Sequence, residues 1–219
     1  DSLVAGLDTN VQTWDALDTI DMGDGHDTIV ARINQSITPN MSNVEALNLS
    51  ATTIATVDLS TNSGVTSITN TGSTVVLTIA GMDAGTTASV INNTAGATFG
   101  FKAAEMLGTE DEASLTVSNV TGAGANTQTI GAGVEIVNLV SSGGVTNTFD
   151  PAFTGSTLNV SGATALTLNG AVNTTFTTIN ASGSTATMTM TSNAAAANSY
   201  TGSSGVDNIT LTGGTAGTV

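Results

Sequence analysis

Short pairs of apolar residues, each separated by a single polar residue, recur along most of this chain and limit the kind of structure it can form. Examples are Leu47–Leu49, Leu77–Ile79, Leu115–Val117 and Leu158–Val160. An apolar residue at every second position places the apolar side chains on one face of a β-strand. Neighbouring pairs are often about ten residues apart, and the stretches between them are rich in Gly, Ser, Asn and Thr, which favour turns. The sequence therefore predicts an all-β protein of many short strands.

This spacing is compatible with two all-β architectures. In a right-handed parallel β-solenoid or β-roll, each coil buries its inward residues against the coils on either side. In tandem small β-sandwiches, strands at similar intervals form two packed antiparallel sheets. The chain of 219 residues has one Trp and one Tyr. A sandwich core would then have unusually few large side chains, so we predict the solenoid and keep the sandwiches as the alternative.

The most specific motif lies near the start of the chain. Asp18–Ile20 (Asp-Thr-Ile) returns nine residues later as Asp27–Ile29, with Gly-Asp-Gly between the two copies. Residues 22–30 fit G-G-x-G-x-D-x-U-x, the nonapeptide of calcium-binding parallel β-rolls, except that Met22 replaces the first Gly. The isoleucine of each copy, and Ile209 further along, would be the inward apolar residue of a nine-residue turn.

The residues of this motif suit a calcium ion. Glycine supplies backbone angles that residues with a Cβ avoid, which lets carbonyl groups converge on a cation while Asp carboxylates complete the shell. Calcium takes roughly six to eight oxygen ligands, so this set suits it better than a nitrogen-preferring metal. A second match at residues 202–210 lacks only the second Gly, where Ser203 stands. The alternative is that Gly-Asp-Gly marks an ordinary β-turn. The candidate metal ligands are Asp18, Asp21, Gly23, Asp24, Gly25, Asp27, Gly202, Gly205 and Asp207.

The charge balance excludes some partners. The chain has seventeen acidic residues but only two basic ones, Lys102 and Arg32, which gives a formal net charge of -15. Seven of the acids fall in the first 27 residues. Nucleic acid is excluded because binding phosphate needs clustered Lys and Arg, and anionic membrane surfaces are disfavoured for the same reason. No apolar run reaches the roughly 18 residues of a membrane-spanning segment, so we expect no membrane insertion.

The absence of cysteine fits a bacterial extracellular protein that is braced by metal ions rather than disulfides. The first residues do not have the pattern of a signal peptide. Because the chain starts at Asp1 and stops in a Gly-Thr-rich stretch, we expect it to be a segment of a longer protein whose export information lies elsewhere.

A repeat at a spacing of 90 residues suggests how the chain is divided. The segment Val44–Leu49 (VEALNL) is similar to Val134–Leu139 (VEIVNL). One short helix is predicted over Phe101–Leu107, ended by Gly108. We expect four parts: RTX-like calcium-binding turns in residues 1–30, a first β-strand-rich unit in 31–120, a second in 121–200, and the start of another RTX-like block in 201–219.

The sequence does not contain a set of residues typical of a catalytic site. A Ser-His-Asp triad would have to use His26, the one histidine, and no Gly-x-Ser-x-Gly motif supports it. Glycoside hydrolysis would need a carboxylate pair, either within residues 110–112 or between Glu45 and Glu135. The aromatic platforms typical of sugar sites are lacking, because Trp14 and Tyr200 lie at opposite ends of the chain. We therefore predict that the chain is not an enzyme and that these acids are structural or solvated.

The chain contains the segment Gly-Asp-Gly-His-Asp-Thr-Ile, the segment Val-Glu-Ala-Leu-Asn-Leu about twenty residues later, and strands rich in Thr, Ser, Ala and Gly. Together these features resemble the surface-layer (S-layer) proteins of Gram-negative bacteria, which share haemolysin-type calcium repeats with secreted RTX proteins. The resemblance implies a secreted structural protein at the cell surface that self-assembles into a two-dimensional lattice held by Ca²⁺, with cell-surface polysaccharide as a further partner. The alternative is a stalk or binding module of a secreted RTX adhesin, and a remote one is an exported polysaccharide-active enzyme. Met22 and Ser203 depart from the glycine pattern of the repeats.

Overall fold

A computed structural model of the chain describes residues 1–8, 11–122, 126–192 and 199–211. These residues form strands joined by turns and loops and contain no helix, so none of them forms a helix that could cross a membrane. The larger sheet has ten strands: β1 (Ser2–Ala5), β5 (Thr28–Ile33), β7 (Ala46–Ala51), β9 (Ser67–Thr71), β11 (Thr87–Ile91), β13 (Glu112–Ser118), β15 (Ile136–Ser142), β17 (Thr157–Gly162), β19 (Thr178–Ser184) and β21 (Ser199–Thr201).

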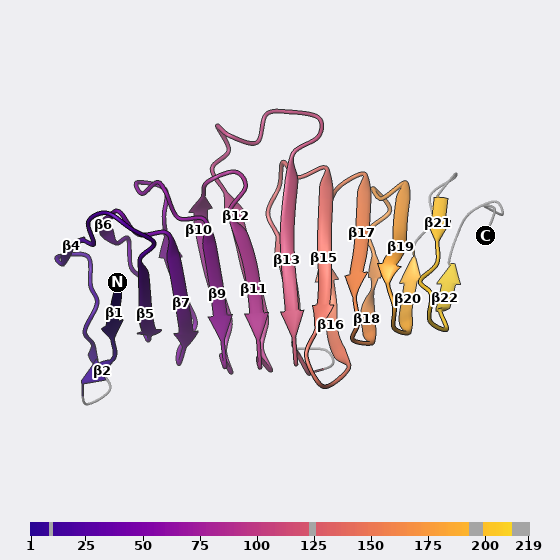
Figure 1. The fold of residues 1–219 in the computed structure, drawn as a ribbon, viewed down its shortest axis with the longest axis horizontal. Coiled ribbons are helices and arrows are strands. Elements are labelled where there is room, and N and C mark those ends of the chain that lie inside the picture. Colours follow the sequence, from indigo (N-terminus) through magenta and orange to yellow (C-terminus); the bar gives the residue numbers. More distant parts are fainter. Residues whose placement is uncertain (9–10, 123–125, 193–198, 212–219) are drawn as a thin grey trace.

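The second sheet lies behind the first in Figure 1 and has eight strands. They are β8 (Ala55–Asp58), β10 (Leu77–Met82), β12 (Ala97–Phe101), β14 (Thr127–Ile130), β16 (Asn147–Ala152), β18 (Leu166–Val172), β20 (Met188–Ser192) and β22 (Asn208–Leu211). Two small sheets lie at the N-terminal end: β2 (Leu7–Asp8) pairs antiparallel with β3 (Val11–Gln12), and β4 (Thr19–Asp21) pairs parallel with β6 (Asn40–Ser42).

The chain alternates between the two large sheets, and every strand pairing within them is parallel. Each coil therefore contributes one strand to each sheet, and about nine coils stack along the long axis of Figure 1 as a β-solenoid. The predicted solenoid is confirmed. Tandem sandwiches would instead have required antiparallel sheets.

The coil is longer than the nine-residue turn that the motif predicted. Ala46 pairs with Ser67, and Thr157 pairs with Thr178, each 21 residues further along the chain. The nine residues between Ile20 and Ile29 correspond to half a coil, because β4 and β5 belong to different sheets. The spacing of about ten residues between apolar pairs has the same origin: each pair is one of the two strands of a coil.

The core consists of the inward side chains of both sheets. Leu115 and Val117 of β13 are fully buried, and Leu139 of β15 pairs with Leu115 in register, so apolar side chains stack in columns from coil to coil. Fully burying such a side chain contributes about 1.5–3 kcal/mol. Ile29 is fully buried, whereas Ile20 and Ile209 are partly buried against the core, so all three predicted inward isoleucines face it.

One corner of the interior is polar, which the alternating pattern did not predict. The side chains of Asn70, Asn93, Asn126 and Asn147 are completely buried where the chain passes from the ten-stranded to the eight-stranded sheet. Asn93 Oδ1 accepts the main-chain N–H of Ser73 at 3.0 Å, and Asn147 Oδ1 accepts that of Val120 at 2.8 Å. These amides satisfy turn N–H groups that the core would otherwise leave unpaired.

The helix expected over Phe101–Leu107 does not form, so that prediction was wrong. β12 ends at Phe101, and a loop rises above the sheets between β12 and β13 (Figure 1). Tertiary contacts override the local helix preference: the ammonium group of Lys102 pairs with Asp83 and donates to the carbonyl of Asn62, and the side chain of Met106 is buried.

Both sheets continue through residue 120, where the sequence suggested a boundary between two units. β13 pairs with β15 in the ten-stranded sheet, and β12 pairs with β14 in the eight-stranded sheet. Of the block expected in 201–219, residues 212–219 lie outside the described part of the chain.

Candidate calcium site

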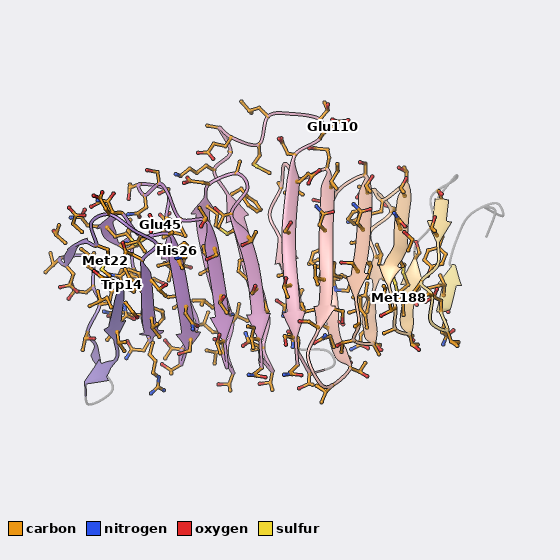
Figure 2. The ribbon with its side chains drawn as sticks, viewed as in Figure 1. Trp14, Met22, His26, Glu45, Glu110 and Met188 are labelled. Atoms are coloured by element: carbon orange, nitrogen blue, oxygen red, sulfur yellow. The ribbon has the colours of Figure 1, made fainter. Side chains whose placement is uncertain are left out.

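The predicted N-terminal loop is a tight turn between β4 and β5. Gly23 and Gly25 have φ angles of 82° and 140°, in the region that residues with a Cβ rarely adopt. The backbone requirement predicted for these two glycines is confirmed. Met22 is partly buried against the core, and His26 is exposed. Figure 2 shows both near the N-terminal end of the solenoid.

Asp27 ends this turn and is the one predicted metal ligand that is completely buried. Its Oδ1 contacts the α-ammonium group of Asp1, whereas its Oδ2 has no hydrogen-bond partner among the described residues. A carboxylate that is removed from water is costly unless a positive charge or several hydrogen bonds compensate it. The environment of Asp27 thus favours a cation beside Oδ2.

The next coil adds a second carboxylate beside Asp27. Glu45 Oε2 accepts the main-chain N–H of Asp27 at 2.8 Å, and the carbonyl of Asp27 accepts the N–H groups of Glu45 and Ala46 at 3.2 and 2.9 Å. Glu45 therefore fixes the backbone of Asp27. The nonapeptide does not include Glu45, which lies 18 residues away from Asp27 in the sequence.

The same arrangement recurs further along the solenoid. Glu135 Oε2 accepts the N–H of Asp111 at 3.1 Å, and the carbonyl of Asp111 accepts the N–H groups of Glu135 and Ile136 at 2.9 and 3.0 Å. The repeat at a spacing of 90 residues thus has a structural cause: Glu45 before β7 and Glu135 before β15 occupy the same position in their coils.

The other predicted ligands of the first loop have different surroundings. Asp21, at the end of β4, accepts hydrogen bonds from Asn43 Nδ2 at 2.7 Å and from the N–H of Gly23 at 3.2 Å, and these two bonds lower the pKa of its carboxyl group. Asp18 Oδ2 accepts the N–H of Asp15 at 2.9 Å, which places it in the turn before β4. Asp24 is exposed. Within the described residues, no three acidic or histidine side chains converge into a metal cluster.

The second loop is connected to the other sheet of the solenoid. Asp207 precedes β22 of the eight-stranded sheet, whereas Asp27 precedes β5 of the ten-stranded sheet. Both carboxylate oxygens of Asp207 are bonded by Ser203, one by its N–H and one by its hydroxyl group, each at 2.7 Å. Desolvation raises the pKa of Asp207, but the hydrogen bonds outweigh it and leave the pKa below its usual value. The hydrogen bonds from Ser203 thus satisfy the carboxylate oxygens that a cation would otherwise bind.

The glycines of this loop lie in close contact with neighbouring atoms, and Gly205 does not have the backbone angles predicted for it. Neither Gly202 nor Gly205 has a positive φ. A Cβ on Gly205 would lie 2.7 Å from the carbonyl carbon of Ala186 in the preceding coil, and a Cβ on Gly202 would lie 2.8 Å from Asp207 Oδ2. The expectation of special backbone angles was wrong for Gly205, and close packing is the reason for glycine at both positions.

The carboxylate pairs considered for hydrolysis do not form one site. Glu45 and Glu135 are four coils apart, or about 19 Å at the usual strand spacing, beyond the roughly 5–9.5 Å of glycosidase pairs. Glu110 lies on the loop that rises above β12 and β13 (Figure 2), and the neighbouring Asp111 accepts the N–H of Gly108 at 2.7 Å.

Comparisons of the chain with protein-family models, with curated proteins and with solved structures give no match.

Proposed function

We propose that this chain is a structural segment of a calcium-dependent bacterial surface layer, exported and self-assembling at the cell surface. The observation that carries the proposal is the buried carboxylate of Asp27, one of whose oxygens has no hydrogen-bond partner among the described residues. It lies in a turn whose glycines have the backbone angles that the calcium nonapeptide demands.

Calcium would be held mainly by the first loop. Asp27 offers Oδ2, Glu45 on the next coil offers a second carboxylate, and the backbone of residues 22–26 offers carbonyl groups, all of which are oxygen donors that calcium prefers. An ion there would neutralise charge at the most acidic part of the chain and link two adjacent coils. The loop at Asp207 offers a weaker site because Ser203 already satisfies its carboxylate.

Calcium binding of this kind would act as a switch between compartments. Extracellular calcium modules have dissociation constants of about 0.1–1 mM, so the site would stay empty in the calcium-poor cytoplasm and fill after export. At about 1 mM calcium, one such site adds about 0.4–1.4 kcal/mol to the free energy of unfolding. For a chain of this length, that corresponds to a rise in melting temperature of about 1–5 °C.

The calcium site is tested by replacing Asp27 with Asn, which keeps the shape of the side chain and removes its charge. We expect calcium to raise the melting temperature of the unmodified chain by a few degrees and to leave that of Asp27→Asn unchanged, as followed by circular dichroism with and without a chelator. Asp150→Asn removes one exposed-face carboxylate of β16 and is the matched control, which should respond like the unmodified chain. An equal calcium response in Asp27→Asn would contradict the assignment.

The stalk of a secreted RTX adhesin is the second candidate, and the continuous rod of stacked coils favours it as a spacer. Electron microscopy of the protein in millimolar calcium separates the two. Ordered two-dimensional sheets that dissolve on chelation support the surface layer, whereas single rods at every concentration support the stalk.

A further inference from the structure

Asn169 and Gly170 form the single Asn-Gly pair of the sequence, and they lie in an irregular part of the eight-stranded sheet. Their strand, β18, pairs in parallel with β16 on one side and with β20 on the other. Asn169 is exposed and Gly170 is half-buried. Such a pair is chemically labile, because glycine has no side chain to shield its main-chain nitrogen from the amide carbon of the preceding asparagine.

The pairing of β18 with β20 is interrupted at this point. Thr167 pairs with Thr189, and the next residue of β18 to pair is Ala171, whose partner lies only two residues further along β20. Residues 168–170 therefore bulge out of register, and a bulge leaves its extra residues outside the ladder. The Asn-Gly pair thus has no registered partner in β20.

The pairing of β18 with β16 ends just before the Asn-Gly pair, and a proline is the physical cause. The last registered pair joins Phe149 to Leu168, after which β16 continues with Asp150 and Pro151. A Cβ on Gly170 would lie 3.5 Å from Cδ of Pro151, so these two residues are neighbours. Proline has no N–H group to donate to a ladder. The Asn-Gly pair therefore lies outside the registered pairs on both sides.

We infer that Asn169 is a site of spontaneous deamidation in the folded chain. The main-chain nitrogen of Gly170 loses its proton and attacks Cγ of Asn169. The new N–Cγ bond closes a succinimide ring, and the amide nitrogen leaves with a proton as ammonia. Water then adds its hydroxyl group to either carbonyl carbon of the ring, the bond from that carbon to the ring nitrogen breaks, and the nitrogen takes the remaining proton. The products are aspartate and isoaspartate, and water is the one reagent consumed.

Regular strands protect the other asparagines of the sheets from this reaction. Asn138 and Asn159 pair with each other in register, and each also pairs with a strand on its other side. Their side chains are bonded to each other at 2.8 Å. A backbone held in this way must open locally before its nitrogen can reach Cγ. We therefore expect these two residues to keep their amide groups while Asn169 loses its own.

Deamidation would change both the charge and the backbone of β18. The new carboxylate would lie on the outer face that also carries Asp150, where two negative charges repel each other. Isoaspartate also adds one methylene group to the main chain of the strand. Val172, three residues later, is buried in the core and pairs with Ser192. The aged chain should therefore melt at a lower temperature than the fresh chain.

The test is a long incubation of the full chain at mildly alkaline pH, followed by peptide mapping with mass spectrometry. Conversion adds about 1 Da to the peptide that contains residue 169, and fragmentation by electron transfer distinguishes isoaspartate from aspartate. We expect Asn169 to convert well before Asn138 and Asn159. The rate should rise with pH, because the attacking nitrogen must lose a proton.

Two variants separate the effect of the sequence from that of the structure. Gly170→Ala shields the nitrogen, and its Cβ has room because the nearest atoms lie 3.5 Å away; it should slow the conversion of Asn169. Ser161→Asn creates a second Asn-Gly pair before Gly162, where both residues have registered partners in β15 and in β19. This pair should convert at least about tenfold more slowly than Asn169 in the same molecule, because a paired segment must first open.

Equal melting temperatures before incubation would show that both variants fold. A free peptide of residues 165–174 gives the rate without the sheet and does not depend on either variant. The inference is overturned if Asn169 stays intact in the folded chain while the peptide converts, or if it converts no faster than the paired Asn-Gly control.

Discussion

Replacing Asn147 with Ala should destabilise the solenoid more than its single amide would suggest. Asn147 is completely buried at the corner before β16. Its Oδ1 accepts the N–H of Val120 at 2.8 Å, and its Nδ2 donates to Ser141 Oγ and to the carbonyl of Ser142, each at 2.8 Å. Asn147 thus connects β16 with the preceding turn of its own coil and with the coil before.

The expected magnitude follows from these bonds. Alanine leaves the N–H of Val120 buried without a partner, which costs about 1–3 kcal/mol, and the loss of the two close Nδ2 bonds adds about 0.5–1.5 kcal/mol each. We therefore expect a loss of about 4 kcal/mol in the free energy of unfolding. The melting temperature should fall by about 8–16 °C, and the Val120 amide should exchange its hydrogen faster.

Asn169→Ala is the control, because it makes the same chemical change at an exposed position of β18. It should change the free energy of unfolding by no more than about 0.5 kcal/mol. If Asn147→Ala melted within a degree of the unmodified chain, the buried asparagines would not hold the corners, and our account of the polar interior would be wrong.

Two further predictions concern close packing and pH. Gly162→Ala should lower the free energy of unfolding by more than about 3 kcal/mol, because the φ of Gly162 is 109° and a Cβ would lie 2.1 Å from the carbonyl oxygen of Ser141. Gly85 has a φ of 80° but open space around it, so Gly85→Ala should lower the free energy of unfolding by only about 1 kcal/mol through backbone strain. Similar melting temperatures for the two variants would refute this. Burial, and then the charge of Asp207, raise the pKa of Tyr200, the one tyrosine of the chain. The folded state therefore holds the phenolic proton more tightly than the unfolded state, and stability falls as the pH rises above about 10. Absorbance of tyrosinate should show a pKa that is lower in Asp207→Asn than in the unmodified chain, and an unchanged titration would contradict the assigned cause.

The fold was predictable because the pattern that carries it is local. Alternation in segments such as Leu115–Val117 identifies a strand with one buried face, and even spacing identifies repeated coils. The sequence does not show that two consecutive strands complete one coil, because that depends on which strands pair. The buried asparagines were also missed, since Asn70 and Asn147 lie in segments with the composition of exposed turns.

The candidate site was predictable in part. Gly23, Gly25 and Asp27 could be found because the nonapeptide is contiguous and its glycines have a backbone cause. Glu45 could not, because only the stacking of coils brings it to Asp27. At the second loop, the motif did not show that Ser203 would bond the carboxylate of Asp207.

The most direct measurement is anomalous diffraction from crystals of the chain grown in calcium. Our account predicts a calcium peak within about 2.3–2.6 Å of Asp27 Oδ2, with oxygen atoms of the adjacent turn around it. A well-ordered Asp27 carboxylate in abundant calcium with no ion beside it would contradict the account.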